Sequence, residues 1–195
     1  TIVMNNRTIS EKIYLITLFI WVVATSLVTT TYFIRLEGFL SLYRILLYFT
    51  ITMILIKELV NLPRTLYHFR FHWEQLLIAL LFIISMFIVA KNREALLDLN
   101  VLLLVFSARD IDFRKLLGTF SFATFLVLVL TIFASNKGVI SNMIMRADSG
   151  YRFSLGFNYV SFASQRLFFA LCSYLMFRGK KISYMELLVL LSATI

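Results

Sequence analysis

The residues best suited to chemistry lie in a basic, glycine-rich segment, residues 136–158, between two apolar runs. This segment carries Lys137, Arg146 and Arg152 against a single acid, Asp148, and it holds three of the chain's six glycines. Arginine suits phosphate or pyrophosphate because its guanidinium group donates two parallel hydrogen bonds to oxygen atoms. The pattern therefore indicates a site for an anionic ligand, and the alternative is an ordinary basic loop that touches anionic lipid head groups.

A second set of candidates interrupts the apolar runs themselves, and it comprises Arg44, Asp98, Asn100, Gln165 and Arg166. A charge at the centre of a bilayer costs roughly 2.5–3.5 kcal/mol, and less near the interface. One interpretation is that the arginines extend to the head groups while Asp98 pairs with one of them. The other is that these side chains line a polar cavity.

Two further patterns suggest metal ligands only weakly. His68 and His72 have the i, i+4 spacing of a helical metal site, but no acid or thiol accompanies them at a matching distance. We interpret them as part of an aromatic interfacial stretch, residues 63–74. Asp110 and Asp112 are similarly expected in a solvated turn, so the sequence predicts neither a metal nor a cofactor.

The composition predicts that these residues are positioned by transmembrane helices. Hydrophobic residues make up 61% of the chain and charged residues 15%, against about 45–50% and about 25% in soluble domains. The apolar runs are unbroken and lack the alternation of outer-membrane barrel strands. Lipid offers no partners to exposed backbone groups, so we expect an all-α, polytopic helical bundle. The single cysteine, Cys172, excludes an intrachain disulfide and is expected to serve packing.

The apolar runs predict six spans and the start of a seventh near Tyr184. A span needs about 20 residues, so the seventh is cut short at Ile195, and we expect the chain to be the N-terminal portion of a longer protein. The fourth run is short and carries Asp98. The six predicted spans are residues 13–34, 39–56, 75–90, 95–108, 116–135 and 159–177.

Lysine and arginine predict the orientation of these spans, because cytoplasmic loops carry the excess of basic residues. With the N-terminus inside, eleven of the 19 basic residues lie on the cytoplasmic side, six lie outside and two lie within spans. The net charge of +9 is explained by these loops and not by a nucleic-acid partner. In this orientation Arg44, Asp98 and Arg166 all fall in the outer half of the membrane, which favours a polar cavity open to the outside.

The basic outer segment also carries a resemblance to a known family. Arg152-Phe153-Ser154-Leu155-Gly156-Phe157-Asn158-Tyr159 resembles the Arg-x-Ser-x-Gly-Phe signature of the O-antigen polymerase and ligase family. The likeness is greatest to the capsular or exopolysaccharide repeat-unit polymerases of Gram-positive bacteria. Residues 107–117 and 178–186 are similar to segments of the same family, whereas the first hundred residues match only in hydropathy.

The resemblance implies a glycosyltransferase that polymerises oligosaccharide units carried on undecaprenyl pyrophosphate at the outer face of the bacterial cell membrane. It implies no metal, and it suggests a chain-length regulator and a flippase as pathway partners. Arg152 and Arg166 are the expected catalytic residues, because the departing pyrophosphate needs positive charge. The expected substrate-binding residues are Arg146, Arg44, Asn158, Gln165 and Asp98.

The chain departs from the family in two respects. Members often follow the Gly-Phe pair with His or Tyr, then Pro, whereas this chain has Asn158 and Tyr159. Members also have about ten or more spans and a second large outer loop, and this chain ends before such a loop. Two alternative functions remain: a transporter or flippase of an anionic lipid-linked saccharide, and a membrane scaffold without a site.

Overall fold

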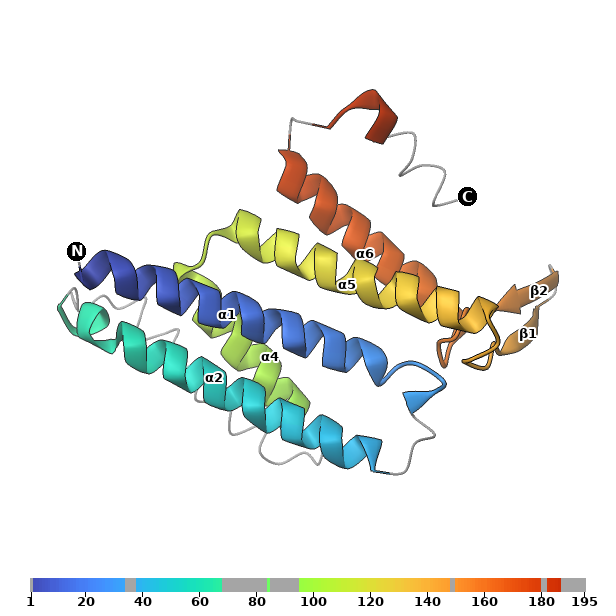
Figure 1. The fold of residues 1–195 in the computed structure, drawn as a ribbon, viewed down its shortest axis with the longest axis horizontal. Coiled ribbons are helices and arrows are strands. Elements are labelled where there is room, and N and C mark those ends of the chain that lie inside the picture. The colour runs from blue at the N-terminus through green and yellow to red at the C-terminus, as the bar shows by residue number, and fades with distance from the viewer. Residues whose placement is uncertain are drawn as a thin grey trace. The chain divides into compact units, whose positions relative to one another are not determined.

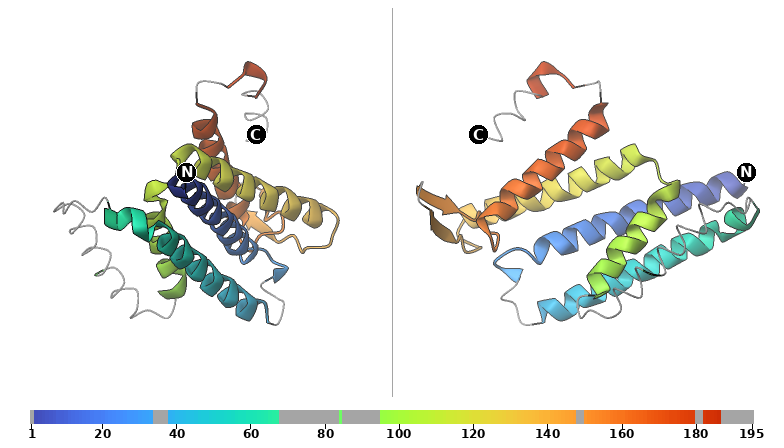
Figure 2. Two further views of the ribbon diagram at one scale, coloured as in Figure 1. Left: turned by 60° about the vertical axis from the view of Figure 1, so that its left-hand side comes forward. Right: turned by 180° about the vertical axis from the view of Figure 1, so that it is seen from behind.

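The described part of the chain is mostly α-helical. A computed structural model describes residues 2–33, 38–67, 84, 95–147, 150–179 and 182–186. Figure 1 and Figure 2 show long helices with one short hairpin, which confirms the all-α prediction apart from that hairpin. The elements are α1 (Ile2–Leu27), α2 (Phe39–Tyr67), α4 (Ala95–Ser107), the 3-10 helix η2 (Ala108–Asp110), α5 (Phe113–Asn136), β1 (Ile144–Ala147), β2 (Gly150–Phe153) and α6 (Val160–Arg178).

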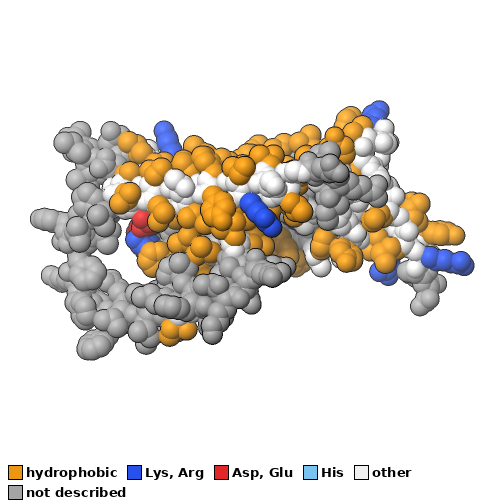
Figure 3. Space-filling view, turned by 90° about the horizontal axis from the view of Figure 1, so that it is seen from below, with side chains coloured by type: hydrophobic (Ala, Val, Ile, Leu, Met, Phe, Trp, Pro, Cys, Tyr) orange, Lys and Arg blue, Asp and Glu red, His pale blue; other side chains and the backbone are white. Residues whose placement is uncertain are grey.

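Four helices of the described chain are long and apolar enough to cross a membrane. They are the segments Thr8–Leu27, Phe39–Asn61, Phe113–Asn136 and Val160–Arg178. Apolar side chains cover much of the coloured surface in Figure 3, as expected for helices that face lipid. These helices fit a multi-pass membrane protein.

The remaining three predicted spans are not among the membrane-length helices of the described chain. The fourth run forms α4, whose 13 residues fall short of the about 20 that a span needs. The third run, residues 75–90, lies outside the described residues except for Ile84, as do the aromatic residues 68–74 with both histidines. The seventh run is described only as far as Glu186.

Helix α2 is longer than its apolar run suggested. The prediction ended this span at residue 56, whereas α2 continues to Tyr67. Lys57 and Glu58 therefore lie on the helix, and the Lys57 side chain is fully buried. The helix continues because its backbone hydrogen bonds do not depend on hydropathy, and the charges on it find partners.

The chain folds as two compact units, one of Thr1–Trp21 with Ser41–Ile111 and one of Val22–Leu40 with Asp112–Ile195. We call them unit 1 and unit 2. In unit 1 the buried Tyr14 hydroxyl donates a hydrogen bond to the carbonyl oxygen of Leu104 (3.0 Å). The Thr50 hydroxyl donates to the side-chain oxygen of the fully buried Asn100. These bonds join the helices of unit 1 through polar groups, which suits an apolar environment.

In unit 2, helices α5 and α6 pack along each other through small residues. Ala123 and Ala170 are fully buried, and the Ser121 hydroxyl donates to the carbonyl oxygen of Ala170 (3.0 Å). A methyl group on Gly118 would lie 3.0 Å from the ring of Phe177. Small residues let the two backbones approach closely, as they do between membrane helices in general. The connection from α5 to α6 then carries the hairpin.

Candidate anionic-ligand site

The hairpin formed by β1 and β2 presents the two loop arginines to solvent. Arg152 pairs with Met145 across the hairpin and Arg146 pairs with Tyr151, and both arginines are exposed. Successive side chains on a strand point to opposite faces, so Arg146 and Arg152 lie on opposite faces of the hairpin. A rigid hairpin therefore does not present both guanidinium groups to one phosphate.

Three residues that follow Arg152, namely Ser154, Gly156 and Phe157, are buried. The hydroxyl of the fully buried Ser154 accepts a hydrogen bond from the backbone N–H of Met143 (2.9 Å). The side-chain oxygen of Asn142 accepts one from the backbone N–H of Leu155 (3.0 Å). Phe157 is also fully buried. The signature-like segment is thus a structural support that directly follows an exposed arginine in the chain.

Backbone hydrogen bonds join this segment to the residues that follow α1. The backbone N–H of Thr31 donates to the carbonyl oxygen of Gly156 (2.9 Å), and the N–H of Asn158 donates to the carbonyl oxygen of Thr29 (2.9 Å). Thr30 and Phe157 form an isolated antiparallel bridge. The predicted span 13–34 ends earlier in the structure, at Leu27, because the following threonines pair with this segment instead of continuing the helix.

Gly156 is required at its position for two reasons. Its φ is +89°, a conformation that residues with a Cβ atom rarely adopt. A methyl group there would lie 3.0 Å from the Thr131 Cγ2 atom and 3.2 Å from the Thr131 carbonyl oxygen. The close approach of this backbone to α5 places Phe157 in the interior of unit 2.

Arg166 lies on α6 above Phe157 and is half-buried. Its Nη1 atom donates to the Ser26 hydroxyl (2.6 Å), and its Nη2 atom donates to the Thr29 hydroxyl (2.9 Å). The guanidinium carbon lies 5.9 Å from the centre of the Phe157 ring. Hydroxyl groups near the end of α1 and one aromatic ring therefore fix the position of this arginine.

The Arg166 guanidinium has no carboxylate within ion-pair distance among the residues that the structure describes. Its described partners are neutral oxygen atoms, so no described acid compensates its positive charge. A partly buried charge of this kind attracts an anion more strongly than an exposed one, because water screens it less. The surroundings of Arg166 thus favour the approach of an anion such as a phosphate group.

The other predicted site residues are placed less tightly. Arg44 and Asp98 belong to unit 1, are exposed, and make no hydrogen bond or ion pair with another described residue. Gln165 is exposed and Asn158 is half-buried, with its backbone N–H on Thr29. Among the described residues Asp98 therefore has no arginine partner, and Arg44 has no acidic one.

Unit 1 contains a charged cluster that the sequence pattern did not predict. The ammonium group of Lys57 lies 2.9 Å from a carboxylate oxygen of Glu58 and donates to the carbonyl oxygen of Ser107 (2.7 Å). Arg109 contacts the other Glu58 oxygen at 2.8 Å, and Asp110 lies 4.0 Å from Lys57. The signal was present in the apolar residues that follow Glu58, such as Leu59 and Val60, which continue the helix beyond the pair.

The two aspartates of the turn before α5 have structural partners. Asp112 caps α5, since its side chain accepts a hydrogen bond from the backbone N–H of Arg114 (2.9 Å). Asp110 lies 3.6 Å from Arg109 as well as near Lys57. No group of three His, Cys, Asp or Glu residues that could hold a metal ion occurs in the described ranges. The predicted histidine pair lies outside those ranges.

Comparisons with known proteins identified no matching family model, no matching curated protein and no matching solved structure.

Proposed function

We propose that this chain belongs to a membrane glycosyltransferase that polymerises oligosaccharide units carried on undecaprenyl pyrophosphate. Its products would be capsular polysaccharide, exopolysaccharide or O-antigen, made at the outer face of the cell membrane. The observation that carries the proposal is the Arg166 guanidinium, which has no carboxylate partner among the described residues and lies in the same unit as the hairpin that presents Arg152. The family-like signature around Arg152 supplies the reaction class.

In the proposed reaction a hydroxyl oxygen of one lipid-linked unit attacks the anomeric carbon of the growing chain. The bond between that carbon and the pyrophosphate oxygen breaks, undecaprenyl pyrophosphate leaves, and the hydroxyl proton passes to solvent or to a base. Negative charge grows on the leaving oxygen, and preorganised cations stabilise it. Arg166 would hold the pyrophosphate close to α6, and Arg152 would close over it from the hairpin.

The remaining candidate residues take secondary roles in this proposal. Because Arg146 faces away from Arg152, it would contact the sugar or a lipid head group and not the same phosphate. Asn158 and Gln165 would bind sugar hydroxyls near the start of α6. Arg44 and Asp98 are exposed on unit 1. In the proposed orientation they lie in the outer half of the membrane, where they would bind substrate.

The proposed topology has the N-terminus in the cytoplasm, residues 136–158 outside, and six spans followed by a seventh. It is supported by the eleven-to-six distribution of basic residues. Single cysteines placed at positions 67 and 145 in a Cys172→Ser background test it with a membrane-impermeant reagent. In intact cells we expect position 145 to be labelled and position 67 to be protected, and the opposite result would overturn the orientation.

The decisive test of function is the replacement of Arg152. In the native host, Arg152→Lys should lose most of the polymer and Arg152→Ala nearly all, because lysine lacks the guanidinium fork. Lys137→Ala, which removes the same charge from the same outer segment, is the matched control and should keep the polymer. Normal polymer from Arg152→Ala at normal protein levels would refute the assignment.

A second variant distinguishes catalysis from a purely structural role of Arg152. If Arg152 only pins its loop to Asp148, then Asp148→Ala should be as damaging as Arg152→Ala. If Arg152 binds the lipid pyrophosphate, Asp148→Ala should retain polymer. The amount and length of polymer, measured together with membrane protein levels, separate the two cases.

A transporter or flippase of an anionic lipid-linked saccharide is the competing function. It is favoured by Lys57 and Glu58. This pair places buried charge inside the α2 segment that is long and apolar enough to span the membrane, as a transport path through the bilayer would require. Purified protein in vesicles that contain lipid-linked repeat units distinguishes the two functions. A polymerase releases undecaprenyl pyrophosphate and lengthens the saccharide, whereas a transporter only moves the lipid between leaflets.

A further inference from the structure

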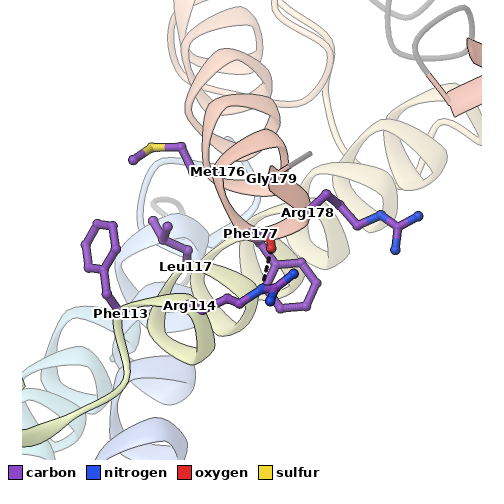
Figure 4. A pocket seen from close by; sticks show the side chains of 7 residues that line it. All are labelled: Phe113, Arg114, Leu117, Met176, Phe177, Arg178 and Gly179. Atoms are coloured by element: carbon purple, nitrogen blue, oxygen red, sulfur yellow. Dashed lines mark hydrogen bonds between the residues drawn. The ribbon is translucent and has the colours of Figure 1, made fainter. Parts of the chain in front are cut away.

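A pocket lies at the ends of α5 and α6 that are remote from the hairpin. It has a volume of about 480 Å³ and is formed by the first turns of α5 and the last turn of α6. Phe113, Leu117 and Met176 supply apolar walls, and Arg114 and Arg178 supply positive charge (Figure 4). Both helices are long and apolar enough to span a membrane. The pocket therefore lies where such helices meet the head-group layer.

Arg114 holds its position through one side of its guanidinium group. Its Nε atom donates to the carbonyl oxygen of Phe177 (2.7 Å), and its guanidinium carbon lies 5.6 Å from the centre of the Phe177 ring. Figure 4 shows this bond at the end of α6. The two terminal nitrogen atoms of Arg114 contact no acceptor in the described part of the chain. They are a preorganised fork of the kind that binds phosphate oxygens.

Arg178 extends away from the apolar wall in Figure 4 and has a carboxylate partner. Its Nη2 atom lies 2.7 Å from Glu186, while its buried Nε atom has no partner among the described residues. The Glu186 carboxylate also accepts hydrogen bonds from the backbone N–H of Ser183 (3.0 Å) and from the Tyr174 hydroxyl (3.3 Å). Arg178 is thus largely neutralised, and Arg114 provides the free positive charge of the pocket.

We infer that this pocket binds the phosphate head group of a membrane lipid with a net negative charge. Arg114 would bind the phosphate, and the lipid's glycerol and acyl carbons would cover Phe113 and Met176, each of which is 60% exposed. The volume falls within the about 300–1,000 Å³ of ordinary ligand pockets. Basic pockets between membrane helices bind such head groups in other proteins. The inference does not depend on the proposed glycosyl transfer.

Native mass spectrometry of the purified protein, released from nanodiscs of phosphatidylcholine with or without phosphatidylglycerol, tests this inference. Wild-type protein should retain phosphatidylglycerol in preference to phosphatidylcholine. Arg114→Gln should bind phosphatidylglycerol about tenfold more weakly, because it loses a charge-assisted hydrogen bond. Lys137→Gln removes the same charge at the other end of α5 and should retain the lipid.

Met176→Trp provides a test that leaves Arg114 and its contact with Phe177 intact. The larger side chain should occupy the pocket and reduce retained phosphatidylglycerol, and this variant decides the question if Arg114→Gln fails to fold. Equal losses in Arg114→Gln and Lys137→Gln would show a diffuse charge effect and overturn the site. Retention of both lipids in equal amounts by the wild type, or unchanged binding in Met176→Trp, would overturn it as well.

Discussion

Lys57 in unit 1 and Arg166 in unit 2 are two cations held inside helical segments, and their partners differ. Lys57 is fully buried against the Glu58 carboxylate at 2.9 Å, with the carbonyl oxygen of Ser107 at 2.7 Å. Arg166 is half-buried and its hydrogen bonds go to neutral oxygens, chiefly the Ser26 and Thr29 hydroxyls. Within the described part of the chain, one positive charge is compensated by a neighbouring acid, and the other is stabilised by the dipoles of hydroxyl and carbonyl groups.

This difference separates a structural charge from a binding charge. A buried cation that already has its carboxylate gains little from a further anion, and its removal from the pair is costly. A cation held only by hydroxyl groups is equally well positioned, but it still gains electrostatic free energy when an anion arrives. We therefore expect the Lys57 cluster to govern folding and Arg166 to govern ligand binding.

The largest effect on folding is expected from Glu58→Gln. The change leaves the buried Lys57 with only the more distant Asp110 carboxylate, at 4.0 Å, and such a loss of compensation costs about 3 kcal/mol of unfolding free energy. Denaturant unfolding of the purified protein in detergent measures it. Asp110→Asn removes a more distant and more exposed acid of the same cluster and is the matched control. Equal stability of the two variants would contradict a structural role for the Lys57 and Glu58 pair.

A smaller loss is expected from Gly156→Ala, which tests how firmly Phe157 is placed beneath Arg166. An alanine at φ +89° is strained and meets Thr131 on α5, so unfolding free energy should fall by about 2 kcal/mol. Gly138→Ala is the control, because Gly138 also has positive φ but has open space around it. If the two variants lose the same stability, the close approach to α5 contributes nothing measurable.

The smallest change in stability, and the sharpest test of the comparison, is expected from Arg166→Met. Replacing a charge that lacks a carboxylate by an apolar side chain should alter unfolding free energy by less than about 1 kcal/mol. Polymer formation in the native host should nevertheless be lost. A stability loss as large as that of Glu58→Gln would make Arg166 a structural residue, and the contrast between the two cations would disappear.

Hydropathy alone predicted most of the helical framework. The run 116–135 corresponds to α5 at Phe113–Asn136, and the run 159–177 corresponds to α6 at Val160–Arg178. These boundaries agree because the apolar stretch and the helix end together at capping residues, Asp112 before α5 and Gly179 after α6. The prediction was wrong where the apolar stretch ends before the helix does. Helix α2 continues past Ile56 because its charged residues Lys57 and Glu58 pair with each other within unit 1.

The hairpin could not be predicted, because its strands are short and their pairing depends on a turn and not on an apolar run. The sequence identified Arg152 and Arg146 as neighbours in one basic loop. The strand pairing then decided that they lie on opposite faces. A distance along the chain does not fix the direction of a side chain until the backbone conformation is known.

By itself the sequence determined that this is an all-α chain with membrane-length helices, and it drew attention to Arg166 as a charge in an apolar run. Only the tertiary structure decided what surrounds that charge. Ser26 and Thr29 lie more than 130 residues earlier in the chain, and their hydroxyls resemble those of any other serine or threonine until the fold brings them to Arg166. The physical reason is that hydropathy and charge are properties of single residues, whereas compensation of a charge is a property of the atoms within a few ångströms of it.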